Sequence, residues 1–223
     1  MTAVPSDHRR LYLLRHSIVA SHRGDVPITD EGRAIARDVG LRLGRAEPRI
    51  RFLYGSTARA RQTAEAVAAG AAEAGAIVEA PREAFALRNP DIYVAGARVN
   101  MVSSFDAVAE QVPGLSAEDA AAVPFFQGFI GAADRVGWWL REANPPGETA
   151  AAVAARMVSF ASSLADGPAA DAATVAVTHS PILRACAQEL LGQDPGEPDW
   201  VSGLLVAVDA SRRVRMSPWS SAP

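Results

Sequence analysis

An adjacent Arg15-His16 pair follows a short apolar run in the segment Leu11 to Ser17. An apolar run of this length is typical of a buried strand, so we expect the pair at the strand's carboxyl end. A guanidinium beside a neutral imidazole suits attack on a phosphoryl group, because Arg fixes the anion and His can attack it. By itself an Arg-His dipeptide is a weak signal, since such short motifs are common on surfaces.

Two further residues strengthen this interpretation. Arg59 lies near the start of an Ala-rich expected helix that directly follows a second expected strand, and His179 lies between a β-branched strand and a helix. In a parallel sheet all these positions meet at the carboxyl edge, where open α/β folds bind ligands. The helix after His179 also presents unpaired backbone N–H groups to an anion. The four side chains together predict electrostatic stabilisation of a transferring phosphoryl group.

The elements that must position these residues alternate between strand and helix. We expect Thr29 to begin a helix that ends near Gly44, and Ser180 to cap a helix with Pro181 at its first position. Periodicity and turn residues predict the remaining elements, which are strands over 51–54, 76–79 and 174–177, helices over 56–74 and 148–164, and a closing hairpin over 203–209 and 213–216. This alternation predicts an α/β fold with a mainly parallel central sheet.

The alternation breaks between about residues 81 and 146, where prolines and aromatic residues gather. We interpret this segment as a mostly helical insertion that packs over the carboxyl edge, within a single domain spanning 1–223. Aromatic side chains usually serve as core, so packing is favoured over substrate contact for its two aromatic clusters, which are Phe125, Phe126 and Phe129, and Trp138 and Trp139.

Composition excludes several classes of function. All 22 basic residues are Arg, and the absence of Lys excludes Schiff-base chemistry, pyridoxal phosphate attachment and a Walker P-loop. One Cys and four widely spaced His residues predict neither a disulfide nor a metal site. The net charge of −3 argues against general nucleic-acid binding. No signal-like segment or apolar span of about 20 residues occurs, so we expect a cytoplasmic protein without membrane partners.

Five motifs together resemble the histidine phosphatase superfamily, the phosphoglycerate mutase-like group. They occur in the family's order and span nearly the whole chain, and they are Arg15-His16-Ser17, Pro27 to Gly32, Ser56 to Ala64, Gly147-Glu148-Thr149 and Val177 to Ser180. The resemblance implies a three-layer α/β/α sandwich, and an activity that needs no metal and no cofactor.

The resemblance also implies individual roles. His16 would become a phosphohistidine, while Arg15, Arg59 and His179 would hold the phosphoryl oxygens. Arg59 is preferred to Arg61 because the family places its Arg four residues before the Thr of the Gln-Thr-Ala motif. We expect Ser17, His22, Glu148 and Ser180 near the substrate; for His22 an ordinary loop position is an equal alternative.

The sequence departs from the family pattern at Asn89. Many relatives carry a Glu here that donates a proton to the leaving group, which an amide cannot do. Asp91 is our first candidate for this acid, because a carboxyl group at a cavity rim can have a raised pKa. Glu83 is the second candidate, and Glu148, water or the absence of a dedicated acid remain open.

These observations predict a phosphomonoester phosphatase that acts on a small-molecule phosphate ester. A phosphomutase is the nearest alternative, for which Arg98, Arg135 and Arg141 could supply additional cations. A catalytically silent phosphate-binding module is the third. An exposed edge strand and the Trp138-Trp139 pair would permit a homodimer.

Overall fold

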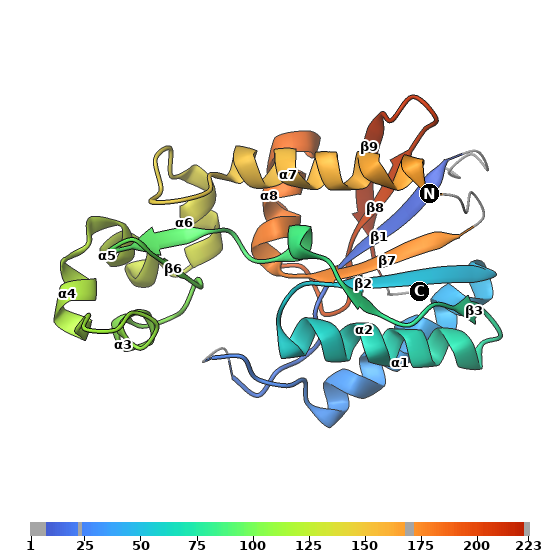
Figure 1. The fold of residues 1–223 in the computed structure, drawn as a ribbon, viewed down its shortest axis with the longest axis horizontal. Helices are drawn as coiled ribbons and strands as arrows, with labels where there is room; N and C mark the ends of the chain where they lie inside the picture. Colours follow the sequence, from blue (N-terminus) through green and yellow to red (C-terminus); the bar gives the residue numbers. More distant parts are fainter. Residues whose placement is uncertain (1–7, 22–23, 168–171, 221–223) are drawn as a thin grey trace.

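The computed structural model describes residues 8–21, 24–167 and 172–220, and its centre is a mainly parallel sheet (Figure 1). The strand order is β3-β2-β7-β1-β8-β9, and β4 also pairs with β2. The strands are β1 (Arg9–Arg15), β2 (Arg49–Tyr54), β3 (Ile77–Val78), β4 (Arg82–Glu83), β7 (Ala173–Thr178), β8 (Gly203–Val208) and β9 (Val214–Trp219). β1 and β2 both run parallel to β7, whereas β8 and β9 form the expected antiparallel closing hairpin.

Helices cover both faces of this sheet, which confirms the three-layer α/β/α prediction. They are α1 (Asp30–Ala46) and α2 (Ala58–Glu73) on one face, and α7 (Ala150–Ser163) and α8 (Ser180–Leu191) on the other (Figure 1). Successive side chains of a strand point to opposite faces. Accordingly, Tyr12 and Leu14 join the core beneath α1 and α2, while Leu11 and Leu13 join the opposite core.

Close approach of α1 and α2 depends on glycine. An ideal Cβ on Gly40 would lie 2.1 Å from the carbonyl oxygen of Val67, and one on Gly70 would lie 2.1 Å from that of Arg37. Since real Cβ atoms do not approach a carbonyl oxygen so closely, any larger residue here would push the two helices apart.

The helix starts follow the sequence signals with one correction. The Thr29 side chain accepts a hydrogen bond from the Gly32 amide and caps α1, as expected. For α8, however, the capping position is occupied by His179, and Ser180 is already the first helical residue. The Ser180 hydroxyl therefore does not cap the helix and donates a hydrogen bond to Glu197 instead.

The segment between β4 and α7 is mostly helical, as expected, and also holds a short β-hairpin. It comprises 3-10 helix η1 (Phe85–Leu87), strands β5 (Ile92–Val94) and β6 (Ala97–Val99), and helices α3 (Phe105–Ala109), α4 (Ala117–Ala122), α5 (Pro124–Gly131) and α6 (Arg135–Arg141). A second 3-10 helix, η2 (Leu164–Asp166), follows α7. Figure 1 shows α3 to α6 at the end of the sheet where β2 and β7 finish.

The aromatic residues of this segment pack mainly on one another. The rings of Phe125 and Phe129 stack at 5.8 Å, and Trp138 contacts both from the edge. Trp139 is fully buried and its Nε1 donates to the Glu148 carbonyl oxygen. These contacts support packing as their main role.

Among the described residues, no helix combines the length and apolar character that crossing a bilayer requires.

Candidate active site

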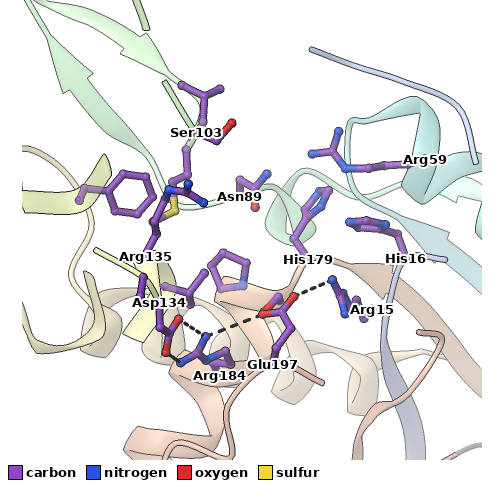
Figure 2. Close-up of a pocket in the computed structure, with 17 residues that line it drawn as sticks. Arg15, His16, Arg59, Asn89, Ser103, Asp134, Arg135, His179, Arg184 and Glu197 are labelled. Atoms are coloured by element: carbon purple, nitrogen blue, oxygen red, sulfur yellow. Dashed lines mark hydrogen bonds and ion pairs between the residues drawn. The ribbon is translucent and has the colours of Figure 1, made fainter. Parts of the chain in front are cut away.

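The structure brings Arg15, His16, Arg59 and His179 to one pocket at the carboxyl edge of the sheet (Figure 2). Strand register explains why, because Arg15 lies opposite Thr178 and Tyr54 lies opposite Val177. The three parallel strands therefore end side by side. The pocket has a volume of about 610 Å³, and the segment between β4 and α7 closes its far side with Met101, Val102, Ser103 and Phe129.

The His16 ring is buried and held in one tautomer. Its Nδ1 lies 2.8 Å from the carbonyl oxygen of Ser17. A carbonyl oxygen can only accept, so Nδ1 carries the proton, and in the neutral ring Nε2 carries the lone pair. The His179 ring lies 5.5 Å away, centroid to centroid. This arrangement prepares Nε2 of His16 for nucleophilic attack.

His179 is buried, and neither of its ring nitrogens has a hydrogen-bond partner among the described residues. Burial lowers its pKa well below 6.5, and the positive charge of Arg59 and the nearby His16 lower it further. A buried polar group without a partner costs about 1 to 3 kcal/mol. A phosphoryl oxygen at hydrogen-bond distance would relieve that cost and would raise the pKa of His179 again.

Arg15 is fixed from three directions. Its Nη2 lies 2.6 Å from Glu197 Oε1, and its Nη1 donates to the Pro198 carbonyl oxygen at 2.6 Å. The guanidinium carbon lies 3.6 Å from the centroid of the Trp200 ring, a cation–π contact. Burial lowers the pKa of Arg15, although an arginine stays charged at neutral pH. The buried Nε has no hydrogen-bond partner.

Arg59 is the more weakly neutralised of the two guanidiniums. Its Nη1 lies 3.4 Å from the Gly24 carbonyl oxygen and 3.9 Å from Asp25 Oδ1. Its Nε is buried without a hydrogen-bond partner, and burial lowers its pKa. Arg61, by contrast, is half-exposed and pairs with Glu65 on the outer face of α2, as expected. Arg59 therefore has the capacity to bind an anion.

The comparison with known families agrees with this geometry. The family model of the histidine phosphatase superfamily (branch 1) matches residues 11–84 and 131–209, which is most of the chain. The chain belongs to the histidine phosphatase superfamily. Both matched segments contain site residues, and the unmatched part between them holds α3, α4 and most of α5. No curated protein sequence matches this chain significantly.

Solved structures share this superfamily fold. The mycobacterial glucosyl-3-phosphoglycerate phosphatase is 20% identical with a TM-score of 0.60, covering 96% of this chain and 100% of its own. Its complex with inorganic phosphate matches at a TM-score of 0.58, 20% identity, and 95% and 96% coverage. A phosphoglycerate mutase from Bacillus anthracis str. Sterne is 17% identical with a TM-score of 0.57, covering 96% and 94%. At these identities the likeness establishes the fold.

The other expected substrate contacts separate into two groups. Ser180 lines the pocket, whereas Ser17 is fully buried and its hydroxyl donates to the Gly32 carbonyl oxygen. Glu148 does not line the pocket; Arg156 pairs with it at 3.0 Å. Ser17 and Glu148 therefore support the architecture around the site. His22 lies outside the described residues.

The structure does not favour Asp91 as the acid that protonates the leaving group. Its carboxylate pairs with Arg88 at 2.6 Å and with Arg98, and it is not among the residues that line the pocket. The hydrogen bond from Arg88 is the main cause that lowers the pKa of Asp91 to about 2. Such a carboxylate holds no proton at neutral pH. Glu83 is exposed on β4 and lies outside the pocket as well.

Several residues at this pocket were missed by sequence reasoning. Trp200 and Glu197 come from the loop after α8 and hold Arg15 in place. Arg184 is almost fully buried beside the pocket, where Asp134 accepts from both of its terminal nitrogens. Asp134 immediately precedes a helix, and an Asp in that position is a recognisable N-cap signal.

The described residues contain no metal-binding arrangement. In residues 8–21, 24–167 and 172–220 there is no group of three or more His, Cys, Asp or Glu side chains that could hold a metal ion. The single cysteine, Cys186, is buried, and burial raises the pKa of its thiol to about 12.

Proposed function

We propose that this chain is a phosphomonoester phosphatase that works through a phosphohistidine on His16. The observation that carries the proposal is the convergence at one pocket of a tautomer-fixed His16 with His179 and Arg59, whose buried ring nitrogens and Nε have no hydrogen-bond partner among the described residues. Membership of the histidine phosphatase superfamily supports it, as does the phosphate complex of the mycobacterial phosphatase with the same fold.

In the first step His16 Nε2 attacks phosphorus while the bond to the leaving oxygen breaks. The bond electrons depart with the leaving oxygen. Arg15 and Arg59 neutralise charge on the phosphoryl oxygens, and the N–H of the neutral His179 ring donates a hydrogen bond to one of them. Preorganised donors of this kind are usually the largest contribution to such catalysis.

In the second step water attacks phosphorus and the P–N bond breaks. The bond electrons return to Nε2, and the proton of the attacking water passes to solvent. The Ser17 carbonyl oxygen holds the Nδ1 proton throughout, so the ring regains the same tautomer. Inorganic phosphate then leaves, and the enzyme is ready for another substrate.

The pocket supports hydrolysis better than mutase activity. A mutase needs additional cations to hold a bisphosphorylated intermediate. Of the three candidate arginines, Arg135 lines the pocket, but Arg98 pairs with Asp91 and Arg141 does not line it. A catalytically silent phosphate-binding module is the less economical alternative, because binding alone does not require His16 to be fixed as a nucleophile.

Kinetics with p-nitrophenyl phosphate test the proposal. We expect release of inorganic phosphate, and a loss of about 10²-fold or more in kcat/KM for Arg59→Ala. Arg61→Ala is the matched control, two residues along the same helix on its exposed face, and should keep the wild-type rate. Equal rates for Arg59→Ala and wild type would contradict the proposal. Isomerisation of a phosphoglycerate that depends on a bisphosphate primer would establish the mutase instead.

A further inference from the structure

The carboxylates of the pocket are all engaged as acceptors. Among the described residues, those that line it are Asp134 and Glu197. Asp134 accepts from both terminal nitrogens of Arg184 at 2.7 and 2.6 Å, and this pairing lowers its pKa to about 2. Glu197 accepts from Arg15 at Oε1 and from the Ser180 hydroxyl at Oε2, both at 2.6 Å. Neither group is arranged to deliver a proton.

The resemblance of the sequence motifs implies a proton-donating glutamate at position 89, where this chain has Asn. Asn89 lines the pocket and is buried, with 8% of its surface exposed. A carboxamide can donate a hydrogen bond but does not ionise, so it cannot release a proton to a departing oxygen. The alternative acids, Asp91, Glu83 and Glu148, do not line the pocket.

Arg135 supplies a positive charge on the opposite side of Asn89. It lines the pocket, its Nε is buried without a hydrogen-bond partner, and the described residues offer it no ion pair. Figure 2 shows its guanidinium turned into the pocket, on the side of Asn89 away from His179. A substrate with its phosphoryl group at His16 would extend its leaving group toward this charge.

We infer that the enzyme acts on phosphoryl compounds whose leaving group departs as a stable anion, and that Arg135 is a specificity-determining residue that pairs with it. This rests on the proposed phosphohistidine mechanism and extends its substrates from phosphomonoesters to acyl phosphates and phosphoanhydrides. When the P–O bond breaks, its electrons remain on the leaving oxygen. A phenolate, a carboxylate or a phosphate carries that charge without a proton, whereas the alkoxide of a simple alcohol is far too basic.

The far wall of the pocket fits the same class of substrate. Met101, Val102, Phe129 and Val136 give it an apolar surface beside Arg135. An apolar wall with one cation suits a leaving group that has a flat or aliphatic body and a single charged oxygen. Aryl phosphates, acyl phosphates and phosphoanhydrides all meet the requirement on the leaving oxygen, and the test below separates them.

The test compares p-nitrophenyl phosphate, acetyl phosphate and pyrophosphate with glycerol 3-phosphate. General acid catalysis contributes about 10² to 10⁴-fold. We therefore expect wild type to prefer at least one of the first three substrates over glycerol 3-phosphate by about 10²-fold or more in kcat/KM. Whichever of the three is turned over fastest identifies the chemistry of the leaving group.

Two variants at position 89 make the test specific. Asn89→Glu installs the missing acid and should raise the ratio of kcat/KM for glycerol 3-phosphate to kcat/KM for p-nitrophenyl phosphate by about 10-fold or more. Asn89→Gln is the matched control, because it has the same length without the acid, and it should give no gain. Arg135→Gln should lower kcat/KM for the preferred substrate and leave phosphorylation of His16 detectable.

Each failure points to a different conclusion. If phosphohistidine forms but wild type hydrolyses glycerol 3-phosphate within tenfold of the other substrates, this inference is overturned and the proposed function stands. An equal gain from Asn89→Gln and Asn89→Glu would also overturn it. If no substrate phosphorylates His16, the proposed function fails together with the inference.

Discussion

Removing the Trp200 ring should weaken catalysis while leaving every charge of the site in place. The ring lies against two groups of the proposed site, with the Arg15 guanidinium carbon 3.6 Å from its centroid and the His16 ring centroid 5.8 Å away. Arg15 is largely withdrawn from water, so its cation–π contact is worth about 2 kcal/mol. The ring contact with His16 adds about 0.5 to 1.5 kcal/mol.

These two contributions set an upper limit on the effect of Trp200→Ala. Since about 1.4 kcal/mol corresponds to a tenfold change in rate, full loss of about 2.5 to 3.5 kcal/mol would lower kcat/KM by roughly 60-fold to 300-fold. Arg15 keeps its contacts with Glu197 and Pro198. We therefore expect a loss of about 10-fold to 100-fold for the alanine variant.

The assay is steady-state hydrolysis of the preferred substrate, with thermal unfolding followed in parallel. Trp200→Phe is the matched control, because it keeps an aromatic face beneath Arg15, and it should stay within about fivefold of wild type. A folded Trp200→Ala enzyme with kcat/KM within about threefold of wild type would refute the reasoning. It would mean that Glu197 and Pro198 suffice to hold the guanidinium.

Two further predictions concern stability. Because burial lowers the pKa of His179, the unfolded chain takes up a proton below pH 6.5 that the folded chain does not. Stability measured by thermal unfolding should therefore fall as the pH drops below 6.5, and it should fall less steeply for His179→Asn. Parallel pH profiles for the two proteins would contradict this prediction. Gly40→Ala should lower the free energy of unfolding in urea by about 1 to 3 kcal/mol, because its Cβ would collide with the Val67 carbonyl oxygen. Gly131→Ala, with open space around its Cβ, should leave that free energy nearly unchanged. Equal losses for the two variants would show that the packing of α1 on α2 is not the cause.

The part of the site that the sequence predicts is the part encoded locally. The apolar run before Arg15 and the β-branched run before His179 specify central strands, and parallel pairing then aligns their carboxyl ends. Thr29 likewise marks a helix start, because its side chain accepts a hydrogen bond from Gly32, only three residues further along the chain. Such signals depend on neighbours in the chain, so they can be recognised without the fold.

The remaining features depend on contacts between distant segments. Asp91 is a plausible acid from its turn alone, but the β5–β6 hairpin brings Arg98 onto its carboxylate. Trp200 reaches Arg15 from 185 positions along the chain. The free energies and pKa shifts that these contacts produce depend on burial and on the distance between the groups. Neither quantity can be read from hydrophobic periodicity or motif spacing.

Covalent trapping of the phosphoryl group tests the central claim most directly. The protein would be mixed with ³²P-labelled acetyl phosphate or p-nitrophenyl phosphate, quenched rapidly in base and digested for peptide mapping. We predict a single label on His16, stable in base and labile in acid, and absent from His16→Ala. Turnover without such a label, or a label on any residue other than His16, would contradict the account.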